Sequence, residues 1–471
     1  MLTSHFRRIR AAAVANALIF AGIAMFAVSS PVWGQDVDYS ASATTPQDDP
    51  VYPGIPPRTK AETTVGSQTL RLYGTILFNA SVSDSIEVGQ DLVLWPLPNS
   101  TAGTTFPDGT AKPNSHIHDL IFTARQSIVG FQVKPSDPSV DKWKPSGRIE
   151  MDFFGGRPFD ANQPQGRVFN EPRLRLAYLK IQNGNWAFLA GQDRMIIAPL
   201  DPVSLSHVAA PLGASAGNLW GWQPQIRAEY SRGMGKASSL FQIGVIRPQF
   251  ADVRLETSPA TGSALDNTTS GLGERTSKPM YQARYSVTLP MSGSKATFGA
   301  GGHYGRERIG AERDIDSWAF AFDFSVPIQS RVRLRGEGFI GSNLIPFQGG
   351  VIQGVAVFNP GGGAPIQFNK IGSGGGWGEL IVKATSDGNN VFYAGAGTDD
   401  PKDANLLTPS GRSKNTFLWA SFFHKVTTNV TTAIEWSNWQ FKTRTFVAGL
   451  PTTNGPAGRG NVFNLAFAYQ F

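Results

Sequence analysis

The 471-residue sequence predicts an all-β chain, folded as a transmembrane antiparallel β-barrel of about 16 strands. Three observations carry this prediction: short segments of alternating apolar and polar residues, connections that are alternately long and short, and a last strand that ends on an aromatic residue. Glycine is frequent, at 52 residues, and only 16% of the residues are charged. Beyond the N-terminus, no stretch reaches the roughly 18 consecutive apolar residues of a membrane-spanning helix.

The first 34 residues have the pattern of a secretory signal peptide. Three arginines precede an apolar stretch at 11–28, and Val32-Trp33-Gly34 provides a cleavage site. The alternative is a transmembrane anchor, but the stretch is near the lower length limit and its alanine content favours cleavage. Removing the three arginines lowers the net charge from +7 to +4, so we expect no nucleic-acid partner. Residues 35–68 are polar and proline-rich, which predicts an extended leader on the periplasmic side.

From residue 69 onward the chain divides into about sixteen short segments that alternate apolar and polar side chains. Such alternation places the two classes on opposite faces of a strand. The predicted strands are 69–81, 119–133, 145–154, 171–182, 185–193, 223–231, 238–248, 279–289, 295–305, 315–326, 331–341, 377–385, 390–397, 414–425, 430–441 and 461–471. We therefore assign 69–471 to a barrel domain.

The connections between these strands are sorted by length. Most even-numbered connections are tight, such as Asn183-Gly184 and Asp387-Gly388-Asn389. Long loops at one rim and short turns at the other are typical of bacterial outer-membrane barrels, and a soluble β-sandwich has no reason to sort them. The odd-numbered connections are predicted to be long: 82–118, 155–170, 194–222, 249–278, 306–314, 342–376, 398–413 and 442–460.

Charged residues occupy every second position of several strands, opposite apolar ones. A charge that faces lipid near the bilayer midplane costs about 2–4 kcal/mol, so we expect these side chains to line a wet lumen. Arginines outnumber acids in this set, which predicts a pore that prefers anions. The alternative is that they pair as wall salt bridges that only stiffen the barrel. The predicted lining residues are Arg125, Arg148, Glu150, Asp152, Arg173, Arg175, Arg227, Glu229, Arg284, Arg331, Arg333, Arg335 and Glu337.

The connection 194–222 is the best candidate for a loop that folds into the lumen and narrows it. It follows Asp193, begins with Arg194, and contains Asp201, His207 and an apolar stretch. The alternative is an extracellular loop packed over the rim.

The last strand places Phe463, Leu465, Phe467, Tyr469 and Phe471 on one face. We expect it to pair with 69–81 and close the barrel, with its apolar face toward lipid. By resemblance to outer-membrane barrels, Phe467, Tyr469 and Phe471 form the signal that the barrel-assembly machinery reads. Aromatic girdles at the membrane interfaces are predicted from Tyr230, Tyr285, Trp318, Trp419, Trp436 and Tyr469.

Four motifs carry a closer resemblance, clearest over 119–193: Arg125-Gln126-Ser127, Ile149–Gly155, Arg173–Tyr178 and Ala190–Asp193. With the terminal Phe471, they resemble the porins related to the DcaP family. That resemblance implies a homotrimeric channel for small anions such as dicarboxylates. DcaP-related porins carry a coiled-coil segment at the N-terminus, whereas 35–68 shows no heptads.

The sequence therefore predicts an exported protein of the outer membrane, surrounded by lipid and lipopolysaccharide. We expect a porin for passive diffusion of small hydrophilic solutes, with a preference for small carboxylates. The alternatives are a barrel enzyme with a rim site that uses His116, His118 or His207, and a closed barrel that acts as an adhesin or anchor. No motif predicts a cofactor or a metal site, and no catalytic set of serine, histidine and acid stands out.

Overall fold

The computed structural model describes residues 62–471 apart from 86, 90, 99–107, 110–118, 138–141, 156–170, 251–270, 311–312, 359–361, 407–410, 445, 448–449 and 452–454. The predicted signal peptide, most of the predicted leader, and both His116 and His118 lie outside these residues. In the described part of the chain, no helix is long and apolar enough to cross a membrane.

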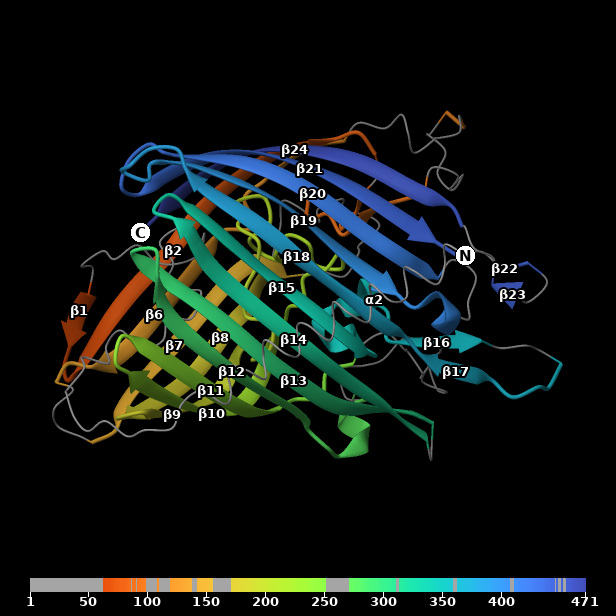
Figure 1. The fold of residues 1–471 in the computed structure, drawn as a ribbon, viewed down its shortest axis with the longest axis horizontal. Helices are drawn as coiled ribbons and strands as arrows, with labels where there is room; N and C mark the ends of the chain where they lie inside the picture. Colours follow the sequence, from red (N-terminus) through yellow and green to blue (C-terminus); the bar gives the residue numbers. More distant parts are fainter. Residues whose placement is uncertain are drawn as a thin grey trace. The chain divides into compact units, whose positions relative to one another are not determined.

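The described residues form a closed antiparallel barrel (Figure 1). The main sheet holds 18 strands, of which β1 is a short strand that folds back onto β2, and β5 and β6 are two parts of one wall strand, leaving sixteen. The wall strands are β2 (Gln68–Ser83), β5 (Asp119–Thr123) with β6 (Ile128–Pro135), β7 (Lys144–Gly155), β8 (Glu171–Asn183), β9 (Trp186–Arg194), β10 (Trp222–Met234), β11 (Ala237–Ile246), β12 (Met280–Met291), β13 (Ser294–Gly310), β14 (Arg313–Gln329), β15 (Val332–Ser342), β18 (Gly372–Lys383), β19 (Asn390–Pro401), β20 (Arg412–Lys425), β21 (Val430–Thr443) and β24 (Ala457–Gln470).

Smaller elements occupy the connections. Figure 1 shows the tight turns at one end of the barrel and two hairpins, β16–β17 and β22–β23, at the other. These elements are β1 (Glu62–Val65), β3 (Glu87–Val88), β4 (Trp95–Pro96), η4 (Glu274–Thr276), η5 (Ile345–Phe347), α2 (Gly349–Ile352), β16 (Val355–Phe358), β17 (Gln367–Lys370), η6 (Asp403–Asn405), β22 (Phe446–Val447) and β23 (Leu450–Pro451).

Every predicted strand overlaps a wall strand, and the differences in extent are largest at three places. The connection predicted at 306–314 is mostly strand, because cross-strand pairs of Arg306 with Asp316 and Arg308 with Asp314 extend β13 and β14. The connection predicted at 342–376 ends earlier, because the glycine-rich stretch 372–376 belongs to β18. The end of the predicted leader is β1, which folds back onto β2 through a turn at 66–67.

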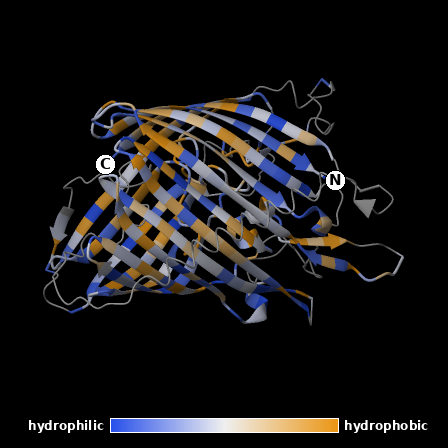
Figure 2. Cartoon of the chain, in the orientation of Figure 1, coloured by the Kyte–Doolittle hydropathy of each residue, from blue (hydrophilic) through white to orange (hydrophobic). Residues whose placement is uncertain are grey.

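The two faces of the wall follow the predicted alternation (Figure 2). Leu72, Ile76 and Phe78 of β2 are exposed on the outer side, while the odd-numbered residues between them are buried. Of the predicted girdle aromatics, Tyr285, Trp318 and Tyr469 are at least 40% exposed on the outer side. The prediction was wrong for Trp419, which is 2% exposed and packs inside the barrel against Phe417.

β24 closes the barrel as predicted. It pairs with β2 from Thr75↔Gln470 to Ser83↔Val462, and Phe467 and Tyr469 are exposed on the outer face. The seam ends in a reciprocal backbone pair, in which the N–H of Phe471 donates to Gly74 and the N–H of Gly74 donates to Phe471.

Deletion of Phe471 is expected to reduce the amount of inserted barrel strongly while leaving the conductance of inserted molecules unchanged. The deletion removes both backbone bonds of the seam end and the ring that packs over Gly74, but no residue of the lumen. Heat-modifiable protein in isolated membranes measures the first quantity, and bilayer recordings measure the second. Equal amounts of inserted protein with and without Phe471 would contradict the prediction.

Candidate channel constriction

The connection between β9 and β10, here named the lumen loop (residues 195–221), lies inside the barrel. Its first half follows the inner wall and bonds to one strand after another. The backbone N–H of Leu200 donates to Glu337 on β15, and that of Val203 donates to Glu379 on β18 at 2.8 Å. Further contacts join Ile196 to Gln282 on β12, Ser204 to Glu435 on β21, and Leu205 to Asn79 on β2.

The loop then reaches the arginine-bearing wall of β8. The side chain of Gln126 accepts from the N–H groups of Val208 and Ala209 at 2.8 and 3.0 Å. Arg175 donates to the carbonyl of Val208 and Arg173 to that of Ala209. The first half of the loop is thus anchored around most of the wall.

The second half of the loop crosses to β18, β19 and β20 and then returns to β10. The side chain of Asn415 donates to the carbonyl of Ser215, and the N–H of Trp220 donates to that of Phe347. At Gly217 φ is +115°, and a Cβ there would lie 2.3 Å from the carbonyl oxygen of Gly376. Only glycine allows the loop to approach the wall so closely at this point.

Nearly the whole lumen loop is buried. Among residues 195–220 only Pro199, Val208 and Ala210 are partly exposed. Two of these flank Ala209, whose carbonyl accepts the bond from Arg173. The partly exposed residues on either side of Ala209 therefore lie beside Arg173 of β8.

These arginines are paired with acids. Asp152 accepts from Arg173 at 2.6 Å and from Arg175 at 3.0 Å. Glu150 accepts from Arg175 at 2.8 Å and from Arg148 at 2.7 Å. The predicted set Arg148, Glu150, Asp152, Arg173 and Arg175 is therefore one interlocked cluster on two adjacent strands.

Two more arginines from the prediction pair with acids of the loops. Arg194 pairs with Asp201 of the lumen loop, and Arg125 pairs with Asp91, with 2.9 Å between its Nε and a carboxylate oxygen. Asp91 was missed by the sequence prediction, because it lies in a long connection outside any alternating segment. Each of these five arginines thus contacts at least one acid in the described part of the chain.

Aromatic rings hold the guanidinium planes in place. Arg173 and Arg175 lie over Trp222 at 5.0 and 4.5 Å from the ring centroid, and Arg125 lies over Phe154 at 3.7 Å. Stacking of this kind suits the planar, weakly hydrated guanidinium group. It orients the cations without neutralising them.

Other predicted lining residues form separate ion pairs. Arg227 lies between Asp193 and Glu229, each at 2.8 Å, and Glu229 also accepts from Lys180 at 2.7 Å. Arg284 pairs with Asp323 of β14 at 2.7 Å. All of these charged side chains except Lys180 are nearly buried. They therefore fit the alternative interpretation, in which salt bridges within the wall stiffen the barrel.

The predicted lining residues Arg331, Arg333 and Arg335 do not meet at a common point. Arg331 is exposed in the tight turn before β15 begins. Arg333 bonds to Ser325 and Ser294 near that turn, whereas Arg335 is 2% exposed and donates to the carbonyl of Asp201. The prediction placed Arg331 on the wall because it extended the alternation of β15 back to residue 331. That residue lies in the turn, where the chain reverses direction and the alternation does not apply.

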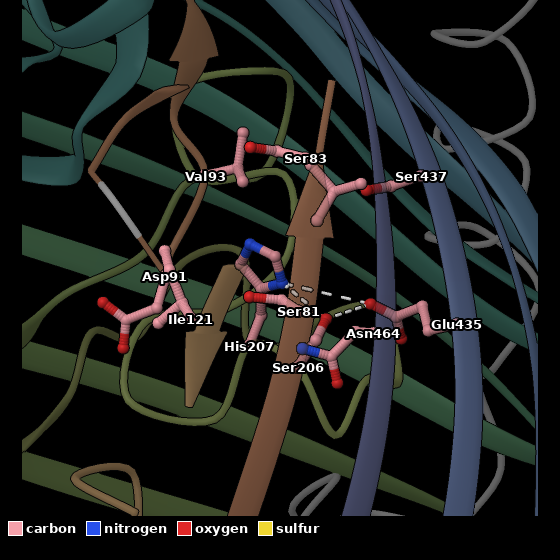
Figure 3. Close-up of a pocket in the computed structure, with 11 residues that line it drawn as sticks. Ser81, Ser83, Asp91, Val93, Ile121, Ser206, His207, Glu435, Ser437 and Asn464 are labelled. Carbon is pink, nitrogen blue, oxygen red and sulfur yellow. Dashed lines mark hydrogen bonds and ion pairs between the residues drawn. The ribbon is translucent and has the colours of Figure 1, made fainter. Parts of the chain in front are cut away.

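His207 lies in the lumen and not at the rim (Figure 3). Its Nδ1 is 2.8 Å from the hydroxyl of Ser206, which donates to Glu435, and burial lowers the pKa of His207 to about 4. The enclosed cavity beside these groups measures about 10 Å³, which is the space of one water molecule. This cluster anchors the loop and leaves no room for a substrate.

Metal ligands do not gather in the described residues: no group of three or more histidines, aspartates or glutamates is placed to hold an ion.

Comparison with known proteins gives structural matches only. The outer membrane channel DcaP of Acinetobacter baumannii matches with 16% identity and a TM-score of 0.60, over 87% of this chain and 99% of that one. An anion-selective porin from Comamonas acidovorans matches with 10% identity and a TM-score of 0.49, over 86% and 100%. OmpT of Vibrio cholerae matches with 10% identity and a TM-score of 0.48, over 87% and 100%. No family model and no curated protein matches the chain.

The match with DcaP shows that the chain has a porin-like barrel fold. The closed wall and its apolar outer face support the predicted outer-membrane location, because closed barrels of an even number of strands are the β-architecture of that membrane.

Proposed function

We propose that the protein is an outer-membrane porin for passive diffusion of small hydrophilic solutes, with a preference for small anions such as carboxylates. One observation carries the anion preference: in the constriction each arginine is more exposed than the acid with which it pairs. The side chains of Arg173 and Arg194 are 29% and 22% exposed, whereas those of Asp152 and Asp201 are 0% and 4% exposed.

The exposure difference decides which charge a solute meets. The acids lie behind the guanidinium groups and are shielded from the lumen, so their field at the solute is weaker than that of the nearer arginines. A guanidinium also offers paired donors to a carboxylate. The buried acids keep the arginines in place and limit how tightly an anion is held, which permits release.

The proposal includes no catalytic activity and no cofactor. It also includes, from the resemblance to DcaP-related porins, a homotrimer that the barrel-assembly machinery inserts through the C-terminal strand. Migration of the unboiled protein as a single barrel on a detergent gel would contradict the trimer.

Planar-bilayer recording tests the proposal directly. The purified full-length protein is expected to give ohmic channels, with a reversal potential in a salt gradient that favours anions.

The second candidate is a closed barrel that acts as an adhesin or anchor, and it is favoured by the burial of nearly all of 195–220. Correctly folded protein without conductance would support that candidate and overturn the porin.

Substitution of Arg173 is expected to lower the anion preference in steps. Arg173→Gln removes the most exposed cation, and Arg173→Glu reverses it, while Arg175 still pairs with Asp152 at 3.0 Å and keeps that acid neutralised. We expect the anion-to-cation permeability ratio to fall about twofold in the first variant and further in the second. Arg232→Glu is the control, because Arg232 is exposed on the outer side of β10. A ratio that is unchanged in both Arg173 variants would contradict the proposed constriction.

A further inference from the structure

The connection between β15 and β18 sends a second segment into the barrel, here named the strap (residues 343–353). It contains η5 and α2, and Figure 1 shows α2 at the end of the barrel that carries the β16–β17 hairpin. Asn343 donates to Glu307 of β13 at 2.6 Å, and the N–H of Val351 donates to Asp399 of β19 at 3.0 Å. The strap therefore spans the inner wall from β13 to β19.

The strap packs against the end of the lumen loop. Leu344 and Phe347 are 0% exposed and share one apolar cluster with Leu219 and Trp220. The N–H of Trp220 donates to the carbonyl of Phe347 at 3.1 Å. The same cluster includes inward-facing residues of β14 and β15, so the strap and the lumen loop together cover the inner wall there. The arginines of the proposed constriction lie on β7 and β8 instead.

The backbone at the end of the strap is strained. At Val351 φ is +52° and at Ile352 it is +55°, directly after Gly350 at +67°. This left-handed region is open to glycine, but a β-branched side chain there is crowded against its own backbone. Residues in such conformations persist only where the surroundings hold them. The closed position of the strap therefore depends on contacts from outside the strap.

Two side chains from other strands hold the strained residues. The carboxyl group of Asp399 accepts from the N–H of Val351, and Arg412 of β20 donates through its Nε to the carbonyl of Val351 at 2.7 Å. A second nitrogen of Arg412 donates to the carbonyl of Ile352, and its guanidinium lies 5.2 Å from the ring centroid of Trp95. Asp399 and Arg412 therefore fix both the N–H and the carbonyl of Val351.

We propose that the strap is a gate, which Asp399 and Arg412 hold shut against its own backbone strain, and that its release opens a second passage between β13 and β19. The inference rests on the proposed channel. Residues 343–353 carry no charged side chain, whereas the wall behind them presents the carboxyl groups of Glu307 and Asp399, which are 0% and 1% exposed. Acids that line a passage favour cations. The second passage is therefore expected to select anions less than the constriction at β7 and β8 does.

A disulfide that locks the strap tests the gate, and the chain has no native cysteine to interfere. A Cβ on Gly350 would lie 4.0 Å from that of Ser373 on β18, which is within the range of about 3.5–4.5 Å for disulfides. In bilayer recordings, the reduced Gly350→Cys/Ser373→Cys protein is expected to show a main conductance and brief openings to a larger one. Oxidation is expected to abolish the larger openings, and a reductant to restore them. Ser373→Cys alone is the control and is expected not to respond to oxidation.

Two substitutions are expected to change the frequency of the larger openings in opposite directions. Arg412→Gln removes the bonds to Val351 and Ile352 and is expected to raise the time in the larger state about tenfold. Ile352→Asn places a residue that tolerates the left-handed region at a half-buried position, and is expected to lower that time about fivefold. The matched controls are Lys414→Gln on the same strand, where the side chain is 39% exposed, and Ile366→Asn, which is 46% exposed beyond the strap.

Three results would overturn the proposal. The first is larger openings that persist in the oxidised double variant. The second is a rise in these openings in Ile352→Asn like that in Arg412→Gln, which would show that packing and not strain governs the strap. The third is the same reversal potential for the larger and the main conductance. A main conductance without larger openings in any variant contradicts this inference alone, whereas absence of conductance from folded protein contradicts the proposed channel.

Discussion

Replacement of residues 199–217 of the lumen loop by a short Gly-Ser linker is expected to raise the single-channel conductance at least threefold, because a wall of about 16 strands encloses an open aqueous channel once its interior is cleared. In the intact protein nearly all of this segment is buried against the wall. The segment is held by contacts with β2, β8, β15, β18 and β21, so it narrows the section that ions must cross.

The same replacement is expected to move the selectivity toward cations. Glu337, Glu379 and Glu435 are 4%, 0% and 3% exposed, because the loop covers them and bonds to each. Without the loop these carboxyl groups face water, in which they ionise readily. The arginine cluster simultaneously loses the carbonyl groups of Val208 and Ala209 and the side chain of Asp201.

The control for this experiment replaces the exposed residues 363–366 in the β16–β17 hairpin by the same linker. That change leaves the lumen intact, so both conductance and selectivity are expected to match those of the wild-type protein. A folded loop variant with wild-type conductance would show that residues 199–217 do not limit the channel.

Alternation along single strands was sufficient to predict the wall. It located each wall strand, placed Arg148, Glu150 and Asp152 inside, and placed Phe467 outside, because the side-chain direction in a strand depends only on the parity of the position. It failed where the parity rule ends, as at Arg331 in a turn. It also does not predict whether a single aromatic residue such as Trp419 faces the lipid or the interior. Trp419 is apolar, yet it faces inward.

The partners of the lining residues could not be predicted in the same way. Asp91, in the connection after β2, meets Arg125, and the loop bond between Val203 and Glu379 joins residues 176 positions apart. Such contacts depend on the path of the loop, which no local pattern specifies. A signal for the missed wall acids did exist: Glu435 stands alone between Ile434 and Trp436, an acid between two apolar residues in a strand.

Substitution of Arg335 by Glu is expected to destabilise the folded barrel, whereas the same substitution at Arg331 is expected to have no measurable effect. Arg335 is 2% exposed, donates to the carbonyl of Asp201 and lies 3.6 Å from Glu379. A glutamate there would face that carboxylate and that carbonyl with no donor between them. Breaking a buried pair in this way costs about 3–5 kcal/mol.

The pair of variants separates local burial from the charge of the strand as a whole. Both substitutions change the net charge equally and lie on the same chain segment, but Arg331 is exposed in the turn. Urea unfolding in detergent measures the stability, and bilayer recording of the Arg335→Glu protein that does fold reports whether the loop has detached, as a rise in conductance. Similar losses of stability in the two variants would contradict an anchoring role for Arg335. A large loss at Arg335 alone shows that this arginine holds the lumen loop at Asp201 and does not serve the passing solute.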